Sequence, residues 1–541
     1  MTKVLIPVEF AGRFCPGTLP SLFKMHLLSL FLSLSLLLRA SAAPPGLTIP
    51  TQQGSVTGTL VSPTVRQFLG IPYATAQRWQ PPQLPPNRTR TFNANRFGDS
   101  CFQNLVPLFA DYLRVVGAGE TLDVPTSEDC LSVNIWSPSV ERLRGKRKAA
   151  VLIWIYGGGF IVGTSNTRFY TGQNIVSSND DIIVVSFNYR LDVFGQPNAP
   201  QLGSDNRNFG LLDIKAAVHW VHNNIAEFGG DPERITLFGH SAGAQAADLY
   251  AFANPGDTFV KGIIPQSGTV SGSALIDRVQ TDSMAWTTVA TAVGCGNAAT
   301  PAQFTCMRNI NPRTLINAVI STGTIFDRIV DNVTDFANIP DRVASGQFLK
   351  AAFLVGNTQN EADSLLVATQ LSTANRILPG LTQAISEVQS LVSTCPSGTA
   401  AVRRRTAGVP VWRYQYQGIF PNLRLYPEMR AYHHAEIPMI FGTYGLSTLR
   451  PGVKPTADQA ALSRYVQRAW VAFARDPQRG LLGLGWPQYD PETKSIAQLG
   501  NPVYSPTGVT FAQGSLVDWA CTNQTELVQV QSQLFGIVLR P

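Results

Sequence analysis

The chain of 541 residues has little charge and little histidine. Charged residues make up 14% of it, the formal net charge is +7, and there are six histidines. Without residues 1–43, which hold four basic residues and one acidic residue, the net charge falls to +4. So small a charge on so long a chain gives no indication of binding to nucleic acid or to a membrane surface. The six histidines also restrict the search for a general base.

Only one long apolar run is present. Leu27 to Leu38 is interrupted only by serines, follows Lys24 and precedes the small residues of 40–43. The run is too short to span a bilayer and is typical of a secretory signal. We therefore predict an N-terminal extension and signal peptide at 1–43, with Met25 as an alternative start, and a single domain at 44–541.

No second run is long enough for a transmembrane helix, and 531–541 lacks the tail of a lipid anchor. We expect a secreted, extracellular protein without a stable membrane anchor, and the oligomeric state is not predicted. Cys15 belongs to the leader, and six cysteines remain: Cys101, Cys130, Cys295, Cys306, Cys395 and Cys521. An even number in a secreted chain predicts three disulfides, for which about fifteen pairings exist. Sequons at Asn87, Asn332 and Asn523 predict glycosylation in the same compartment.

Strand and helix patterns alternate along most of the chain. Residues 149–156 and 181–188 are continuous apolar runs, typical of strands buried on both faces of a parallel sheet. Apolar residues recur at helical spacing over 210–228 and 458–475. Shorter strands are predicted at 65–74, 235–238, 262–265, 353–355 and 411–416. The pattern predicts an α/β fold, with a mostly parallel central sheet and helices on both faces.

The segment FGGDPERITLFGHSAG, 228–243, contains a G-x-S-x-G motif. Gly239 and Gly243 flank Ser241 at the spacing that lets a strand turn sharply into a helix and expose a serine hydroxyl. An isolated motif of this kind is usually a turn without chemistry. Here the strand before it and the helix after it favour Ser241 as a nucleophile, which needs a base, an acid and an oxyanion site.

A histidine must accept the proton of Ser241. Four histidines are set aside, because they lie in the leader, on the preceding helix or on the opposite side of the strand from Ser241: His26, His219, His222 and His240. The base is therefore His433 or His434, in AYHHAEIPMIFG. A metal site here would need an H-E-x-x-H motif or a third ligand, and neither is evident, so no metal or other cofactor is expected.

Two further parts of such a site have candidates. The glycines Gly157 to Gly159 directly follow a predicted strand, where backbone amides could hold an oxyanion, with the amide of Ala242 as a third donor. A phosphate loop is the alternative, but GGGFIVG does not match G-x-G-x-x-G. The acid should follow a strand between 241 and 433, where Glu361 and Asp363 share one loop. Spacing alone does not separate these two carboxylates.

Assembled in order, these segments resemble the type-B carboxylesterases of the cholinesterase-like α/β-hydrolase family, in the style of secreted fungal members. The matching segments run from about residue 55 to the last helix: FLGIPYA (68–74), SEDCLSVNIW (127–136), IYGGGF (155–160), NYRLDVFG (188–195), NFGLLDIKAAVHWVHNNIAEFGGDPERITLFGHSAG (208–243), QSG (266–268), LVGNTQNEA (354–362) and YHHAEIPMIFG (432–442). The resemblance implies an α/β-hydrolase fold and a serine carboxylesterase acting on small-molecule or lipid esters through an acyl-enzyme.

The resemblance also implies a role for each site residue. Ser241 would be the nucleophile, Glu361 the acid and His433 the base. The oxyanion hole would consist of Gly158, Gly159 and Ala242, and Ser267 would place a hydroxyl near the acid. The implied disulfides are Cys101–Cys130, Cys295–Cys306 and, by remainder, Cys395–Cys521.

The chain departs from the family pattern at several positions. His240 and Ala362 replace a frequent glutamate and a frequent glycine, and the stretch from Glu361 to His433 is short. The flap, residues 101–130, has no tryptophan on which a quaternary ammonium could stack, so choline esters are not expected as preferred substrates. Two alternatives remain: a triacylglycerol lipase whose apolar flap opens at an oil interface, and a catalytically silent binding protein on the same scaffold.

Overall fold

Continuous buried strands build the central sheet. The computed structural model describes residues 46–203, 207–270, 272–273, 282–373, 379–519 and 521. The strands β9 (Ala149–Ile155) and β10 (Ile182–Phe187) are buried at every position, because helices cover both faces of the sheet. These are the strands predicted from the two long apolar runs. The predicted signal peptide at 1–43 and the sequon at Asn523 lie outside the described residues.

Within the described residues, the sheet contains eleven strands in the order β18-β17-β16-β15-β12-β11-β9-β10-β8-β4-β3. The seven from β17 to β10 pair in parallel. Strands at both edges pair antiparallel to their neighbours. The remaining bounds are β3 Thr59–Ser62, β4 Val65–Pro72, β8 Ser132–Pro138, β11 Gly230–His240, β12 Val260–Gln266, β15 Ala352–Thr358, β16 Val411–Tyr416, β17 Lys494–Asn501 and β18 Ser505–Gln513. The predicted α/β fold with a mostly parallel central sheet is confirmed.

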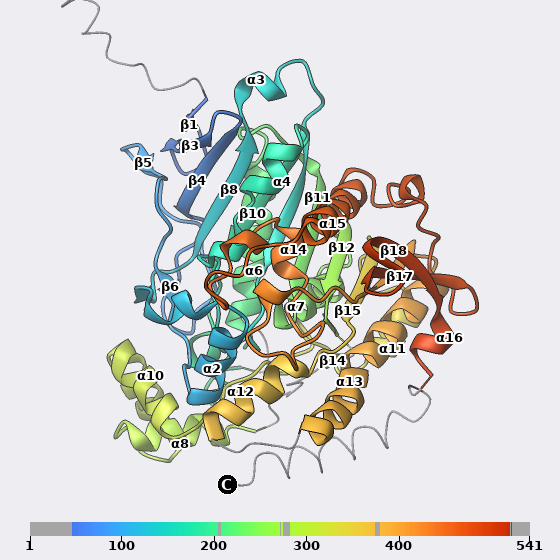
Figure 1. Cartoon of the computed structure of the whole chain (residues 1–541). Helices are drawn as coiled ribbons and strands as arrows, with labels where there is room; N and C mark the ends of the chain where they lie inside the picture. Colours follow the sequence, from blue (N-terminus) through green and yellow to red (C-terminus); the bar gives the residue numbers. More distant parts are fainter. Residues whose placement is uncertain are drawn as a thin grey trace, which may run out of the picture. The chain divides into compact units, whose positions relative to one another are not determined.

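Helices cover both faces of this sheet. Figure 1 shows α4 and α15 on the face toward the viewer, and α6 and α7 behind the strands. The bounds are α2 Pro107–Val115, α3 Val140–Leu143, α4 Gln173–Ser178, α5 Asp192–Gly195, α6 Phe209–Asn224, α7 Ala242–Ala253, α8 Met284–Ala292, α9 Pro301–Asn309, α10 Pro312–Ser321, α11 Ile339–Ala344, α12 Asp363–Thr373, α13 Pro379–Thr406, α14 Ile437–Ile440, α15 Ala457–Arg475 and α16 Gly514–Val517. The predicted helices at 210–228 and 458–475 correspond to α6 and α15.

The start and the packing of α15 follow from its sequence. The hydroxyl of Thr456 caps the helix by accepting the N–H of Gln459 at 3.1 Å, which satisfies one of the free amides of the first turn. The predicted apolar face of the helix is buried, with Trp470 donating to Gln266 at 3.0 Å. This packing fixes the end of β12 beside the end of β11, where Ser241 follows.

Short strands pair outside the central sheet: β1 (Thr48–Ile49), β2 (Val56–Thr57) and β5 (Phe92–Asn93); β6 (Ser100–Cys101) and β7 (Thr126–Ser127); β13 (Gly268–Thr269) and β14 (Gly272–Ser273). The main apolar core lies along the sheet, and a smaller core lies under α8 to α10. In the smaller core the rings of Trp79 and Trp286 lie edge to face, 4.8 Å apart, and the Cys295–Cys306 disulfide joins its helices.

Candidate active site

Ser241 stands at a sharp turn between β11 and α7. Its φ is 56° and its ψ is −123°, a conformation that few non-glycine residues adopt. A Cβ on Gly239 would lie 2.3 Å from the carbonyl oxygen of Gly243, and one on Gly243 would lie 2.0 Å from that of Ile155. Both glycines are therefore required by close backbone contact. Ser241 is only partly buried, so its hydroxyl is not sealed in the core.

The structure separates the two carboxylates that spacing left open. Glu361 lies in the loop after β15 and is fully buried. Its Oε1 accepts the N–H of Thr358 at 2.7 Å, and its Oε2 is hydrogen bonded to Nδ1 of His433. The backbone N–H of His433 also donates to the carbonyl of Glu361 at 3.2 Å. Asp363 instead binds Arg430.

The two adjacent histidines face different partners. His434 contacts Tyr170, whose hydroxyl lies 3.4 Å from Nε2. Burial, with a smaller effect from His433, lowers the pKa of His434 to about 3, so its imidazole is neutral. His434 also has a φ of 92°, in the left-handed region that favours glycine. Of the two candidates that elimination left, the one beside a carboxylate is His433.

His240 joins this group, which the sequence did not predict. The alternation of side chains along a strand predicts that His240 points away from Ser241. The structure places its ring 4.3 Å from that of His433 and 5.4 Å from that of His434, measured between centroids. Burial, and then the two neighbouring imidazoles, lower its pKa well below the usual value. The signal that could have found it is its departure from the family's glutamate at this position.

The triple glycine lies beside the serine. A Cβ on Gly157 would be 2.8 Å from the Cβ of Ser241, so only glycine allows this approach. Gly158 and Gly159 have φ values of 121° and 65°. Within the described part of the chain, the amides of Gly158 and Gly159 donate to no protein acceptor. Ala242 is the first residue of α7, where a backbone amide lacks a partner within the helix.

A second buried acid, Glu436, lies two residues after His434. It is 1% exposed, and neither carboxylate oxygen has a hydrogen-bond partner among the described residues. Burial, and then the charge of Glu361, raise its pKa well above the usual value. Tyr112 from the flap lies nearby, with its ring centroid 6.5 Å from that of His433. No role for Glu436 or Tyr112 was predicted from the sequence.

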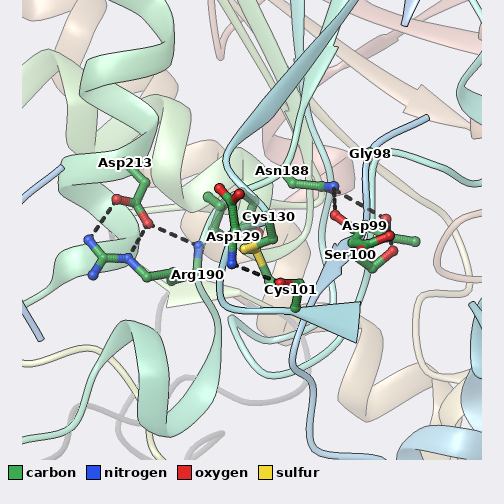
Figure 2. Close-up of a disulfide and its surroundings, with 12 residues drawn as sticks. Gly98, Asp99, Ser100, Cys101, Asp129, Cys130, Asn188, Arg190 and Asp213 are labelled. Atoms are coloured by element: carbon green, nitrogen blue, oxygen red, sulfur yellow. Dashed lines mark hydrogen bonds and ion pairs between the residues drawn. A yellow bond between two sulfur atoms is a disulfide. The ribbon is translucent and has the colours of Figure 1, made fainter. Parts of the chain in front are cut away.

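The flap is tethered at its base. Its ends are joined by the Cys101–Cys130 disulfide, with the Cα atoms 5.1 Å apart. Figure 2 shows this bridge between Asn188, which donates to the carbonyl of Asp99, and the ion pair of Arg190 with Asp213. The other bridges are Cys295–Cys306 and Cys395–Cys521. All three pairings are those that the resemblance implies.

Ser267 follows β12 and is fully buried. Its backbone N–H donates to the carbonyl of Gly356 on β15 at 2.8 Å, so it is attached to the strand that leads to Glu361. Its hydroxyl has no hydrogen-bond partner among the described residues. The role that the resemblance implies for this hydroxyl stays a prediction.

Comparison with known proteins finds esterases and lipases to which this chain is similar. A model of the family described as "Carboxylesterase family" matches residues 45–377. The chain is 33% identical over 523 residues to a protein named Secreted lipase 5 from Gibberella zeae, covering 88% of this chain and 95% of the relative. It is 34% identical over 450 residues to a chlorogenic acid esterase from Aspergillus niger, covering 80% of this chain and 84% of that protein. A fumonisin B1 esterase from Sphingopyxis macrogoltabida is 30% identical over 512 residues, covering 87% of this chain and 89% of that protein.

Proposed function

We propose, from the premise that this chain belongs to the carboxylesterase family, that Ser241, His433 and Glu361 hydrolyse carboxylic esters through an acyl-enzyme. The chain is a carboxylic ester hydrolase of the α/β-hydrolase fold. The hydrogen bond between Glu361 and Nδ1 of His433 is the observation that carries the assignment of residues. A neutral imidazole that donates from Nδ1 has its lone pair on Nε2, the atom that must take the serine proton.

The reaction has two halves. Ser241 Oγ attacks the ester carbonyl while His433 Nε2 takes its proton, and a tetrahedral oxyanion forms. The imidazolium then protonates the leaving alcohol as the carbon–oxygen bond breaks, which leaves an acyl-serine. Water, deprotonated by the same imidazole, attacks the acyl carbonyl, and the carboxylic acid departs as Ser241 regains a proton. Glu361 stays ionised and balances the charge of the imidazolium.

The amides of Gly158, Gly159 and Ala242 hold the oxyanion in both halves. This assignment is supported by the close approach of the glycine segment to Ser241. It is also supported by the amides of Gly158 and Gly159, which have no hydrogen-bond acceptor among the described residues. Donors fixed in place before the reaction stabilise the charge without reorganising, and losing one typically costs about 100- to 1,000-fold in kcat.

The enzyme acts outside the cell on dissolved or lipid esters. Three disulfides and the exposed sequon residues Asn87 and Asn332 support an oxidising, secretory compartment. A relative is named as secreted. Among the described residues, no helix is both long and apolar enough to cross a membrane.

A triacylglycerol lipase is the second candidate. It is favoured by a relative named as a lipase and by the apolar helix α2 in the flap, which buries Phe109 and Leu113. Activity that rises abruptly when a long-chain ester passes its solubility limit would assign the lipase. Saturating kinetics on short dissolved esters, without such a rise, would assign the esterase.

The decisive test is Ser241→Ala, with Ser178→Ala on the exposed end of α4 as the control. We expect Ser241→Ala to lower kcat/KM on short nitrophenyl esters by about 10⁴-fold or more and to abolish labelling by a fluorophosphonate probe. The control should match the wild type. If the probe fails to label folded wild-type protein, the chain is a silent binding protein and the proposal is wrong. An acyl-length series on the wild type then identifies the substrate class.

A further inference from the structure

The two segments that carry Glu361 and His433 are joined by an ion pair, in addition to the hydrogen bond between these two residues. Asp363 is the first residue of α12, and Arg430 lies three residues before His433. Arg430 donates from Nε and Nη2 to the two carboxylate oxygens of Asp363, at 3.0 Å each. Its backbone N–H donates to the same carboxylate at 2.9 Å. This bidentate geometry fixes the relative orientation of the two side chains as well as the distance between them.

The ion pair stands at one end of a set of contacts between the same two segments. The N–H of Asn360 donates to the carbonyl of Ala431 at 2.9 Å, and that of His433 donates to the carbonyl of Glu361 at 3.2 Å. The hydroxyl of Ser364 reaches the carbonyl of His433 at 3.4 Å. The segments 360–364 and 430–433 are thus held together on both sides of the Glu361–His433 hydrogen bond.

The carboxylate of Asp363 also fixes a third segment. The hydroxyl of Ser386, in α13, donates to Oδ1 of Asp363, and it lies 3.2 Å from Nη2 of Arg430. Asp363 is 5% exposed, whereas the side chain of Arg430 is 25% exposed. At the first position of α12, the carboxylate further interacts with the positive end of the helix dipole.

The histidine loop needs such support because its backbone is strained. His434 has a φ of 92°, which a non-glycine residue adopts only when its surroundings hold it. Without the attachment at Arg430, the strain would be relieved by movement of the loop, and His433 is the adjacent residue. A displacement of about 1 Å can cost about 100-fold in rate.

We propose that Asp363 and Arg430 form a positioning pair, which holds the imidazole of His433 where Nε2 accepts the proton of Ser241. The pair acts through the loop, and this inference rests on the proposed function. Both residues belong to the machinery that orients the base, rather than to the groups that react.

Replacing either partner tests the pair. We expect Arg430→Gln and Asp363→Asn each to lower kcat on a short nitrophenyl ester by about 10- to 100-fold, with KM changed less than twofold. The double variant should be no slower than the slower single variant, because the two side chains act as one unit. Arg430→Lys keeps the charge without the planar fork and should remain at least threefold below the wild type.

Arg475→Gln is a matched control. Arg475 binds Asp181 through the same two nitrogens, at 2.8 and 2.6 Å, before β10 and so at the opposite end of the parallel strands from Ser241. Its kcat should equal that of the wild type. All values are divided by the fraction of sites that a fluorophosphonate titrates, so that loss of folded protein does not count as loss of rate.

Unchanged kcat per titrated site in Arg430→Gln, or in Arg430→Lys if the first variant does not fold, would overturn the positioning role. A rise in KM with constant kcat would overturn it as well. Full activity of Ser241→Ala would instead refute the proposed function, whatever the ion-pair variants do. The two failures are therefore distinguishable.

Discussion

The imidazole rings of His240 and His433 lie against each other, with centroids 4.3 Å apart and planes inclined by 44°. His434 contacts the same His240 ring, at 5.4 Å. Burial lowers the pKa of both His240 and His434, and burial together with the charge of Glu361 raises the pKa of Glu436. The carboxylate that is hydrogen bonded to Nδ1 of His433 is that of Glu361.

The first prediction concerns stability in acid. The pKa of His434 is about 3 in the folded protein and 6.5 without the fold, so between these values the unfolded chain binds a proton that the native state does not. Stability therefore falls as the pH drops below 6.5, by roughly 3 kcal/mol at pH 4 from this residue alone. His434→Asn removes the titration, and asparagine tolerates a positive φ.

We expect His434→Asn to show a shallower loss of unfolding free energy from pH 6.5 to 4 in urea titrations. His222→Asn, on the partly exposed surface of α6, controls for the loss of a histidine elsewhere. Equal slopes for the wild type and His434→Asn would show that His434 takes up its proton without unfolding.

The second prediction concerns Asp192, at which stability falls as the pH rises. Burial raises the pKa of Asp192 from 3.8 to about 7, despite hydrogen bonds from Val193 and Asn104 and a longer contact from Phe326. The native state then holds a proton that the unfolded chain has lost, so stability falls as the pH rises from about 4 to 7, by roughly 4 kcal/mol.

Asp192→Asn should flatten this part of the stability curve, and it should be more stable than the wild type at pH 8. Beside it, Nδ2 of Asn104 lies 3.2 Å from Oδ2 of Asp192, and Oδ1 of the same amide has no hydrogen-bond partner among the described residues. Asparagine also suits the φ of 46° at this position. A variant that is less stable than the wild type at pH 8 would contradict the raised pKa of Asp192.

The third prediction compares two neighbouring glycines. A Cβ on Gly158 would lie 2.1 Å from the carbonyl oxygen of Val162, so Gly158→Ala must displace the backbone. At Gly159 the nearest atom, on Ile161, is 3.4 Å away, and the cost is the positive φ alone, about 1 kcal/mol. We expect Gly158→Ala to lower kcat by about 100-fold or more and Gly159→Ala by less than tenfold. Equal losses would argue against a backbone-placed oxyanion site at Gly158.

The parts of the fold that could be predicted are those whose residue pattern is visible within one short stretch of sequence. The strand β9 is an unbroken apolar run because both its faces are covered. The glycines that flank Ser241 are required by close contacts, of Gly239 with Gly243 and of Gly243 with the neighbouring strand β9. The hairpin of β17 and β18 was not predicted. Residues 505–513 are at most half-buried and at the sheet edge, so they lack the apolar alternation that marks a strand.

The active-site side chains that could not be assigned from the sequence are those whose partners lie far away along the chain. Two carboxylates in one loop could not be separated by spacing, because their partners His433 and Arg430 lie about 70 residues further along the chain. The period-two rule set His240 aside as the base, but it says nothing of a loop packed against the strand end, so it did not predict the contact of this ring with His433. Such contacts depend on tertiary structure alone.

The last prediction concerns the flap. The Cys101–Cys130 bridge closes a loop with a sequence separation of 29, so its removal should cost about 3 to 4 kcal/mol of stability in the chain-entropy account. The flap also carries Tyr112 to His433, so loss of the tether should let this ring leave the base. The double variant Cys101→Ser/Cys130→Ser should therefore lose kcat/KM at temperatures where it is still folded. Cys295→Ser/Cys306→Ser, which opens a bridge with a separation of 11 in the smaller core, should lose stability with little change in kcat/KM. If both double variants keep full activity below their melting temperatures, the flap does not need its tether to complete the site.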